Sequence, residues 1–187
     1  MDKIDLAQFN NAGFSRGASG LKEAVWLLCK QLVFIANPFG FYPLKRALLR
    51  WFGARVGAGL IVKPGAKISF PWRFESSANV WIGEDAFLLS LDRIQVGANV
   101  CISQRAFLCT GSHDWSAPHF TLITKPIVVE EGAWICADVF IGPGVTIGRN
   151  AVITAGSVVT KDMPPNMICS GNPCVPQKSR VLATGAP

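Results

Sequence analysis

Aliphatic residues recur at every sixth position in the C-terminal half of this 187-residue sequence. The uninterrupted run is Val129, Ile135, Ile141, Ile147, Ile153 and Val159. The residue four places after each of the first five is small or β-branched: Ala133, Val139, Val145, Ala151 and Ser157. An α-helix repeats about every 3.6 residues and a half-buried strand about every two, so neither produces a period of six.

Shorter runs with the same spacing occur earlier in the chain. They are Val56, Val62 and Ile68, then Ile82 and Leu88, then Val96, Ile102 and Leu108. If each hexapeptide forms one short strand and one turn, three hexapeptides close a triangular coil whose repeating aliphatic residue points inward. Stacked coils bury a continuous apolar column and pair parallel strands from coil to coil. The spacing therefore predicts a mainly β chain folded as a parallel β-helix.

The segment before the repeat has helical spacing instead. Apolar residues recur every three or four positions over residues 21–35 and again over 44–52, with a break at 37–43. This pattern predicts two short amphipathic helices. We therefore divide the chain into an N-terminal helical cap (1–52), a β-helix (53–165) with an inserted loop at 110–126, and a C-terminal extension (166–187).

Basic side chains lie along the two predicted helices. They are Lys22, Lys30, Lys45, Arg46, Arg50 and Arg55. Two interpretations fit them: a cap that packs on the rest of the protein or on a neighbouring subunit, or a segment that lies on a membrane surface. The most apolar stretch, 24–41, is interrupted by polar residues, so we expect no helix that spans a membrane.

The net charge of +6 favours an anionic partner: a phosphate-bearing cofactor, nucleic acid or a lipid head group. No phosphate-binding glycine loop and no aromatic and basic pattern typical of nucleic-acid binding is present. Six cysteines are scattered without a C-x-x-C pair (Cys29, Cys101, Cys109, Cys136, Cys169, Cys174). We expect reduced thiols in a cytoplasmic protein, because no secretory signal precedes them.

Several segments resemble one family, the hexapeptide-repeat acyltransferases. Residues 134–148 (WICADVFIGPGVTIG), 155–166 (AGSVVTKDMPPN) and 171–174 (GNPC) resemble the family's late coils. Residues 101–114 and 122–127 are most similar to the colanic-acid-type polysaccharide O-acetyltransferases. The resemblance implies a left-handed β-helix, which is an exception to the right-handed crossover rule, and a homotrimer with active sites between subunits.

The inserted loop contains both histidines of the chain, His113 and His119. Acyl transfer from a thioester to a hydroxyl needs a general base that titrates near neutral pH, as imidazole does. The match at residues 111–114 implies that His113 is this base and later the acid for the CoA thiolate. His119 matches no family position and is interpreted as a surface residue. Asp114 is the nearest carboxylate to His113, but successive side chains of an extended segment point opposite ways, so we expect Asp114 to bind substrate or to cap the loop. The sequence leaves open which group orients the His113 ring.

The resemblance also implies acetyl-CoA as cosubstrate, lying along the late coils between two subunits. By matching positions, Trp134 packs near the active site. Ala137 and Ala155 offer main-chain contacts to the pantetheine arm. Thr160 and Lys161 lie near the adenosine end, where a lysine suits a phosphate.

The phosphate contact departs from better-known sugar acetyltransferases of this fold. Where those proteins carry Arg after a Pro-Cys pair, this chain has Val175. Lys178 and Arg180 follow closely, and either is a candidate phosphate partner.

The acceptor side rests on weaker signals. Ser90, Asp92 and Arg93 break the hexad pattern just before the histidine loop and are either cleft-facing or part of a solvated corner. Lys125 either contacts an anionic sugar or ends the loop.

We therefore predict an acetyl-CoA-dependent O-acetyltransferase acting on a sugar hydroxyl of a surface-polysaccharide or lipid-linked saccharide precursor. Transfer would be direct in a ternary complex, because no nucleophile-base pair indicates a covalent intermediate. The alternatives are a non-catalytic β-helix scaffold and an acetyltransferase for a small non-polysaccharide acceptor. A zinc hydratase resembling γ-carbonic anhydrase needs three histidines per metal, so we expect no metal site. The expected location is the cytoplasm, with peripheral membrane contact through the N-terminal helices as an alternative.

Overall fold

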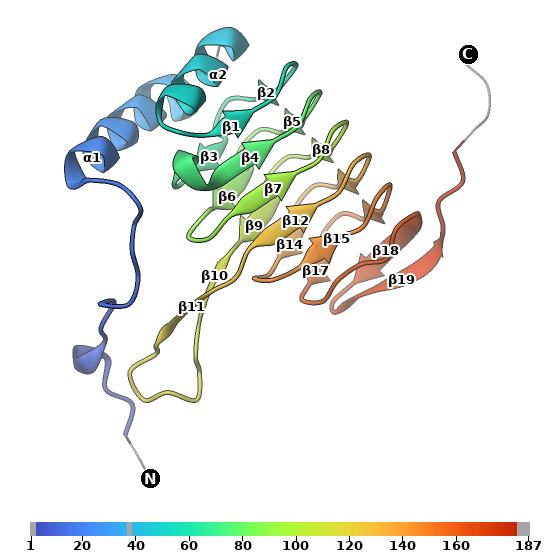
Figure 1. The fold of residues 1–187 in the computed structure, drawn as a ribbon. Coiled ribbons are helices and arrows are strands. Elements are labelled where there is room, and N and C mark those ends of the chain that lie inside the picture. The colour runs from blue at the N-terminus through green and yellow to red at the C-terminus, as the bar shows by residue number, and fades with distance from the viewer. Residues whose placement is uncertain (1–2, 37–38, 183–187) are drawn as a thin grey trace.

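The computed structural model describes residues 3–36 and 39–182, so part of the predicted break at 37–43 lies outside the described residues. Its body is a three-sided parallel β-helix (Figure 1). The first sheet contains β1 (Arg55–Val56), β4 (Phe74–Ser76), β7 (Ile94–Val96), β12 (Ile127–Val129) and β15 (Thr146–Ile147). The third sheet contains β3 (Lys67–Ile68), β6 (Phe87–Leu89), β9 (Phe107–Cys109), β14 (Phe140–Ile141) and β17 (Val158–Val159).

The second sheet is the longest and includes the C-terminal strands. It contains β2 (Ile61–Val62), β5 (Trp81–Ile82), β8 (Cys101–Ile102), β13 (Trp134–Ile135), β16 (Val152–Ile153), β18 (Met167–Gly171) and β19 (Cys174–Ser179). β18 continues this sheet in parallel, and β19 folds back on it as an antiparallel hairpin. The coil-to-coil pairing therefore extends beyond residue 165.

Strand register confirms that three hexapeptides make one coil in the C-terminal half. Trp134 pairs with Val152, 18 residues further along the chain. In the N-terminal half Trp81 pairs with Cys101, 20 residues further along. The additional residues all lie between the third and first sheets, at a corner that we call the wide corner. The helix η3 (Pro71–Arg73) and the insertion at 110–126 both leave the coils there.

The repeating aliphatic residues form the core. Every member of the uninterrupted run from Val129 to Val159 is at most 1% exposed. The small residues four places on are also buried, so they fill the inner sides of the corners. The preceding turn residues often have positive φ, as at Gly132 (+71°) and Asn150 (+57°). A Cβ at Gly132 would lie 2.2 Å from Asn150 Oδ1, so a larger residue here would displace the Asn150 side chain of the next coil.

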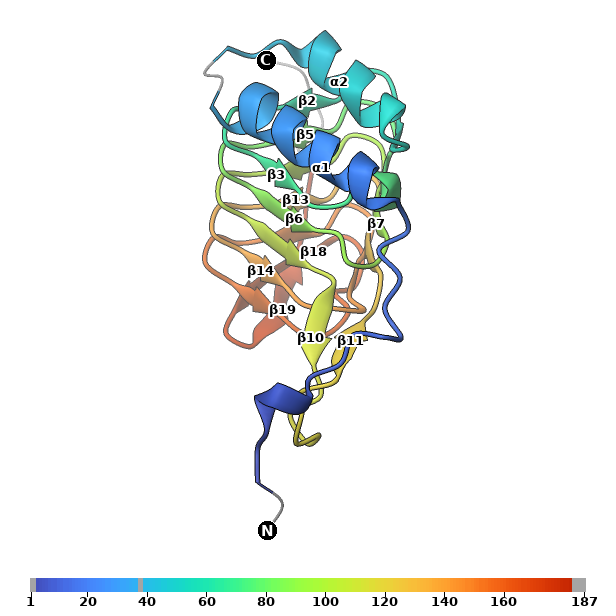
Figure 2. The same cartoon turned by 90° about the vertical axis from the view of Figure 1, so that its left-hand side faces the viewer.

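Helices cover the N-terminal end of the β-helix (Figure 2). They are α1 (Gly20–Cys29), continued by the π-helix η2 (Lys30–Ile35), and α2 (Tyr42–Trp51). Backbone N–H groups of each coil donate to carbonyls of the next coil, so the first coil has carbonyls without a strand partner. Side chains of α2 donate to them: Lys45 Nζ to Val62 O (2.9 Å), Arg46 Nη1 to Leu60 O (3.0 Å) and Arg50 Nη2 to Val56 O (2.9 Å). Three of the basic residues noted in the sequence therefore hold the cap on the β-helix.

The short helix η1 (Leu6–Gln8) lies in the N-terminal segment (3–19), which runs beside the body before α1 begins. Ser19 caps α1, because its Oγ accepts a hydrogen bond from Lys22 N (3.3 Å). Within the described residues, each helix is too short or too polar to cross a lipid bilayer.

Candidate active site

The inserted residues 110–126 form an antiparallel arm that projects from the wide corner (Figures 1 and 2). Its strands are β10 (Gly111–His113) and β11 (Leu122–Thr124), with His113 paired to Leu122. The arm is anchored at its base, where Lys125 N donates to Thr110 O (3.0 Å). A rigid repeat thus carries a short ribbon that presents His113 away from the core.

The His113 ring is oriented by the backbone of the arm. Its Nδ1 lies 2.8 Å from the carbonyl oxygen of Phe120. A carbonyl oxygen can only accept, so this hydrogen bond requires a proton on Nδ1. In the neutral ring the Nε2 lone pair is then available as a base. The group that orients His113 could not be identified from sequence, because Phe120 approaches it only through the turn of the arm, where its φ is +49°.

Asp114 is engaged in the turn next to His113. Its Oδ1 accepts hydrogen bonds from Ser116 Oγ (2.5 Å) and Ser116 N (2.9 Å). These bonds lower the pKa of the Asp114 carboxyl, chiefly through the Ser116 hydroxyl. Of the two expected roles, the geometry favours the loop cap. His119 is also local in its contacts, since its Nε2 lies 3.1 Å from Thr121 Oγ1.

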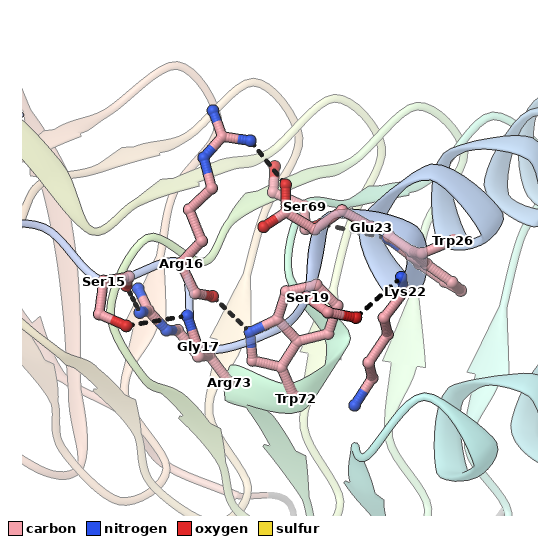
Figure 3. Close-up of polar contacts among 10 residues, drawn as sticks. All are labelled: Ser15, Arg16, Gly17, Ser19, Lys22, Glu23, Trp26, Ser69, Trp72 and Arg73. Atoms are coloured by element: carbon pink, nitrogen blue, oxygen red, sulfur yellow. Dashed lines mark hydrogen bonds and ion pairs between the residues drawn. The ribbon is translucent and has the colours of Figure 1, made fainter.

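The N-terminal segment also reaches the arm, which the sequence did not indicate. Asp5 N donates to Pro118 O (2.9 Å), and the Phe9 ring contacts the His113 ring edge to face at 5.8 Å. Figure 3 shows how the same segment is held on η3. There Trp72 Nε1 donates to Arg16 O (2.8 Å), and Arg73 donates to Ser15 O. The segment has no periodic pattern, so sequence reasoning had no signal for this contact.

A polar hollow of about 470 Å³ lies between the N-terminal segment, η3 and the base of the arm. Asp92 and Glu75 line it together with three arginines, Arg55, Arg73 and Arg93. Thr124 of β11 completes the side toward the arm. The predicted acceptor residue Asp92 thus lies at the arm's base.

The structure also places Ser90 and Lys125, the other residues predicted near the acceptor. Both predictions for Ser90, that it faces the cleft or lies in a solvated corner, are wrong, because its side chain is fully buried. Its Oγ accepts from Phe70 N (2.9 Å) and donates to Phe70 O (3.0 Å), so it holds the wide corner together. Lys125 is exposed, and its stem lies over Gly144, where an added Cβ would be 3.0 Å from Lys125 Cδ.

The predicted CoA contacts lie on other parts of the β-helix. Trp134 is 45% exposed on the outer surface of the second sheet, and its Nε1 donates to Ser103 Oγ (2.9 Å). Ala137 and Ala155 occupy the same corner in successive coils, linked by a hydrogen bond from Gly156 N to Ala137 O (3.0 Å). These residues form a strip on the second sheet and at the corner where it meets the third sheet, whereas the arm leaves from the wide corner at the other edge of the third sheet. One chain therefore does not bring His113 to Trp134.

The candidates for the phosphate and adenosine end of CoA differ in whether their side chains are already hydrogen-bonded within the protein. Thr160 and Lys161 are exposed directly after β17, on the side of the wide corner, and Lys178 is exposed on β19. Arg180 Nη1 instead donates to Gly132 O (2.9 Å) and Asn150 O (3.0 Å). Arg180 therefore fixes the end of β19 to two corners and is a poor candidate for phosphate, which leaves Lys178 as the better one.

All six cysteines are unpaired. Burial, and to a smaller extent Cys174, raises the pKa of the Cys169 thiol to about 11. In the part of the chain that the structure describes, no three metal-ligating side chains come together.

Comparisons with known proteins agree with this architecture. Residues 126–161 match the family model described as bacterial transferase hexapeptide (six repeats). The chain is also 40% identical over 177 residues to the putative colanic acid biosynthesis acetyltransferase WcaF of Escherichia coli K12, covering 95% of this chain and 97% of that relative. It belongs to the hexapeptide-repeat acetyltransferases.

Three further matches support this assignment. The galactoside O-acetyltransferase of Escherichia coli K12 is 34% identical over 138 residues, covering 70% of this chain and 66% of that relative. A solved galactoside acetyltransferase in complex with coenzyme A superimposes with a TM-score of 0.77 at 27% identity, covering 95% of this chain and 92% of the other. The Vibrio cholerae acetyltransferase VCA0836, complexed with acetyl-CoA, gives a TM-score of 0.76 at 26% identity and covers 85% of each chain.

Proposed function

We propose that this hexapeptide-repeat acetyltransferase transfers acetyl from acetyl-CoA to a hydroxyl of a saccharide, in the biosynthesis of a surface polysaccharide or its lipid-linked precursor. The observation that best supports this proposal is the hydrogen bond from His113 Nδ1 to Phe120 O, which leaves Nε2 available as a base on an exposed arm. The relatives' names and the bound cosubstrates of the structural neighbours support the cosubstrate and the acceptor class.

His113 performs the proton transfers in this mechanism. Nε2 takes the proton of the sugar hydroxyl while the hydroxyl oxygen attacks the thioester carbonyl. The tetrahedral intermediate then collapses, the carbon–sulfur bond breaks, and the imidazolium returns the proton to the CoA thiolate. The acetyl ester and free CoA leave without an acyl-enzyme intermediate.

The cosubstrate would lie along the strip of late coils. Trp134, Ala137 and Ala155 would line the pantetheine arm, and Thr160, Lys161 and Lys178 would lie toward the phosphates and adenosine. Because the arm leaves from a different corner of the β-helix, the His113 of one subunit would complete the strip of its neighbour. We therefore propose a homotrimer with active sites between subunits, as the family resemblance implies.

The acceptor would occupy the hollow at the arm's base. Asp92 offers a carboxylate to sugar hydroxyls there, and Lys125 offers an ammonium group from the adjoining turn. Asp114 would contribute by holding the turn. The protein would work in the cytoplasm, where acetyl-CoA is present.

The experiment is a transfer assay on the purified full-length chain. Acetyl-CoA is supplied with a panel of oligosaccharides and with small non-saccharide alcohols, and free CoA thiol and acetylated product are measured by absorbance and mass spectrometry. We expect acetyl esters on saccharides. CoA binding without turnover on any acceptor would instead favour a scaffold, and preferential turnover of small alcohols would favour the alternative acceptor class.

The subunit arrangement has its own test. His113→Ala protein and Ala155→Trp protein, each inactive in our account, are unfolded together and refolded as mixed oligomers. We expect activity to return in the mixture, because some interfaces combine an intact arm with an intact strip. A mixture as inactive as its parents would contradict a site shared between subunits.

A further inference from the structure

The outer surface of the helical cap is apolar. On α1 and η2 the outward stripe is formed by positions 21, 24, 28, 31 and 32, and it contains no charged residue. Leu21, Leu28 and Leu32 in that stripe are 58–75% exposed. On α2, Leu44 and Trp51 form a second outward stripe, with Trp51 72% exposed. We call Leu21, Leu28, Leu32, Leu44 and Trp51 the cap face.

The charged side chains of the same helices turn the other way. Lys45 is fully buried, and Arg46 and Arg50 reach carbonyls of the first coil, as described above. Glu23 forms an ion pair with Arg16 (2.6 Å) beside η3. A helix on a water-facing surface normally buries its apolar stripe and exposes its charges. Here α1 and η2 bury the apolar residues Trp26 and Phe34 in the core and also expose an apolar outer stripe, which indicates that the outer stripe faces a non-aqueous environment.

The rim of the cap face is basic and aromatic. Lys22 lies over the Trp72 ring (5.1 Å), and Lys63 lies over the Tyr42 ring (6.0 Å). Burial lowers the pKa of the Lys30 amine, and the nearby Lys67 ammonium lowers it further. Among the described residues of the rim, the acids Glu23 and Glu84 are each paired with a base, Arg16 and Lys63. The rim therefore has surplus positive charge.

We propose that the cap face binds the surface of an anionic lipid bilayer, with its leucines and Trp51 at the acyl boundary and the rim lysines among the head groups. Segments that lie at a bilayer surface typically combine apolar residues with flanking lysines and aromatic residues. Cationic side chains near the surface strengthen the binding through anionic lipids. A second copy of the cap fits less well, because face-to-face packing would bring two basic rims together. The helices lie on the bilayer, since they are too short to cross it.

The test is co-sedimentation of the full chain with vesicles. Vesicles of phosphatidylglycerol and phosphatidylcholine (1:3) are compared with pure phosphatidylcholine, at low and high salt. We expect binding to the anionic vesicles that weakens with salt. The double variant Leu28→Gln/Trp51→Gln should bind at least tenfold more weakly, since each substitution replaces an apolar side chain that the bilayer would bury with a polar one. Val181→Gln, which changes an exposed apolar residue outside the cap, should bind like the wild type.

Circular dichroism melting and light scattering accompany the vesicle assay. We expect the double variant to melt and to assemble like the wild type, so that lost binding reports the cap face. Failure of the wild type to sediment with anionic vesicles, or undiminished binding of a folded double variant, overturns the proposal. A lower molar mass for the double variant in solution, without vesicle binding by the wild type, would assign the face to a second copy instead. Neither outcome bears on acetyl transfer, which is assayed without vesicles.

Discussion

The Nδ1 atom of His113 lies 2.8 Å from the carbonyl oxygen of Phe120, across the turn of the arm. The general base of the proposed reaction is therefore held by the backbone of its own loop, with its tautomer fixed for base catalysis. Asp114, the adjacent carboxylate, is occupied by Ser116. The distinction matters, because it separates the residue that transfers protons from the residue that shapes the turn.

The substitution Asp114→Asn should reduce kcat only slightly. Asn keeps the side-chain oxygen that accepts from Ser116, and Asn is common in such turns. We expect kcat within about fivefold of wild type, far from the 10² to 10⁴ typical of a lost general base. The measurement is a steady-state acetyl-transfer assay with saturating acetyl-CoA. A loss of about hundredfold or more would instead make Asp114 part of the proton-transfer machinery.

Phe9→Ala should reduce kcat by about two- to tenfold, because an aromatic edge contact is worth about 0.5–1.5 kcal/mol. The Phe9 ring contacts the His113 ring on the arm, so the Kd for CoA should not change. Leu6→Ala on the same segment is the matched control, since Leu6 is exposed. Equal effects of the two substitutions would mean that the segment acts only by covering the arm.

Lys45→Ala should destabilise the fold. The substitution leaves the Val62 carbonyl without its donor and removes a charged hydrogen bond worth about 1.5–3 kcal/mol. The measurement is urea unfolding at pH 7, with Lys161→Ala as an exposed control expected to stay within about 0.5 kcal/mol. An unchanged unfolding free energy for Lys45→Ala would show that the cap does not depend on this bond.

The pH dependence of the Lys45 effect has a defined sign. Burial lowers the pKa of the Lys45 amine below its usual value of 10.5. Between the two values the unfolded chain binds more protons than the folded one, so this group's contribution to stability rises with pH in that window. The difference in unfolding free energy between the wild type and Lys45→Ala should therefore increase as the pH approaches 10.5.

Cys169 should resist alkylation in the folded protein. Its pKa of about 11, against an ordinary value near 9.0, leaves about a hundredfold less thiolate at pH 8. Iodoacetamide labelling followed by peptide mass spectrometry compares the folded chain with the chain in guanidinium. The same shift makes stability fall as pH rises from about 9 to 11, because the unfolded thiol ionises first. Equal labelling rates in both states would contradict the burial of this thiol.

Much of the body was predictable because its physics is local and repeated. The period of six at Val129 to Val159 specifies which residues point inward, and the 18-residue register follows from three such steps. The inner position of Ala133 and its equivalents follows from the same corner geometry. The reading of the chain as an acetyltransferase rested on the family resemblance, which the comparisons confirm.

The parts that were not predictable depend on contacts between distant segments. Ser90 is buried because the wide corner closes over it from Phe70, 20 residues away. Arg180 binds corners at Gly132 and Asn150, which a motif comparison with the family's phosphate-binding arginine does not reveal. The contact of Phe9 with His113 joins two segments without any shared pattern. The sequence therefore predicts the arm and its histidine but not the residues that hold them in place.

The most direct test of the central claim is acetyl transfer by His113→Ala. With acetyl-CoA and a saccharide acceptor that the wild type acetylates, kcat should fall on the order of 10² to 10⁴. The Kd for CoA and the oligomeric mass should remain those of the wild type, because His113 lies on the exposed arm away from the core. Wild-type turnover by the folded variant would contradict the assignment of His113 as the general base.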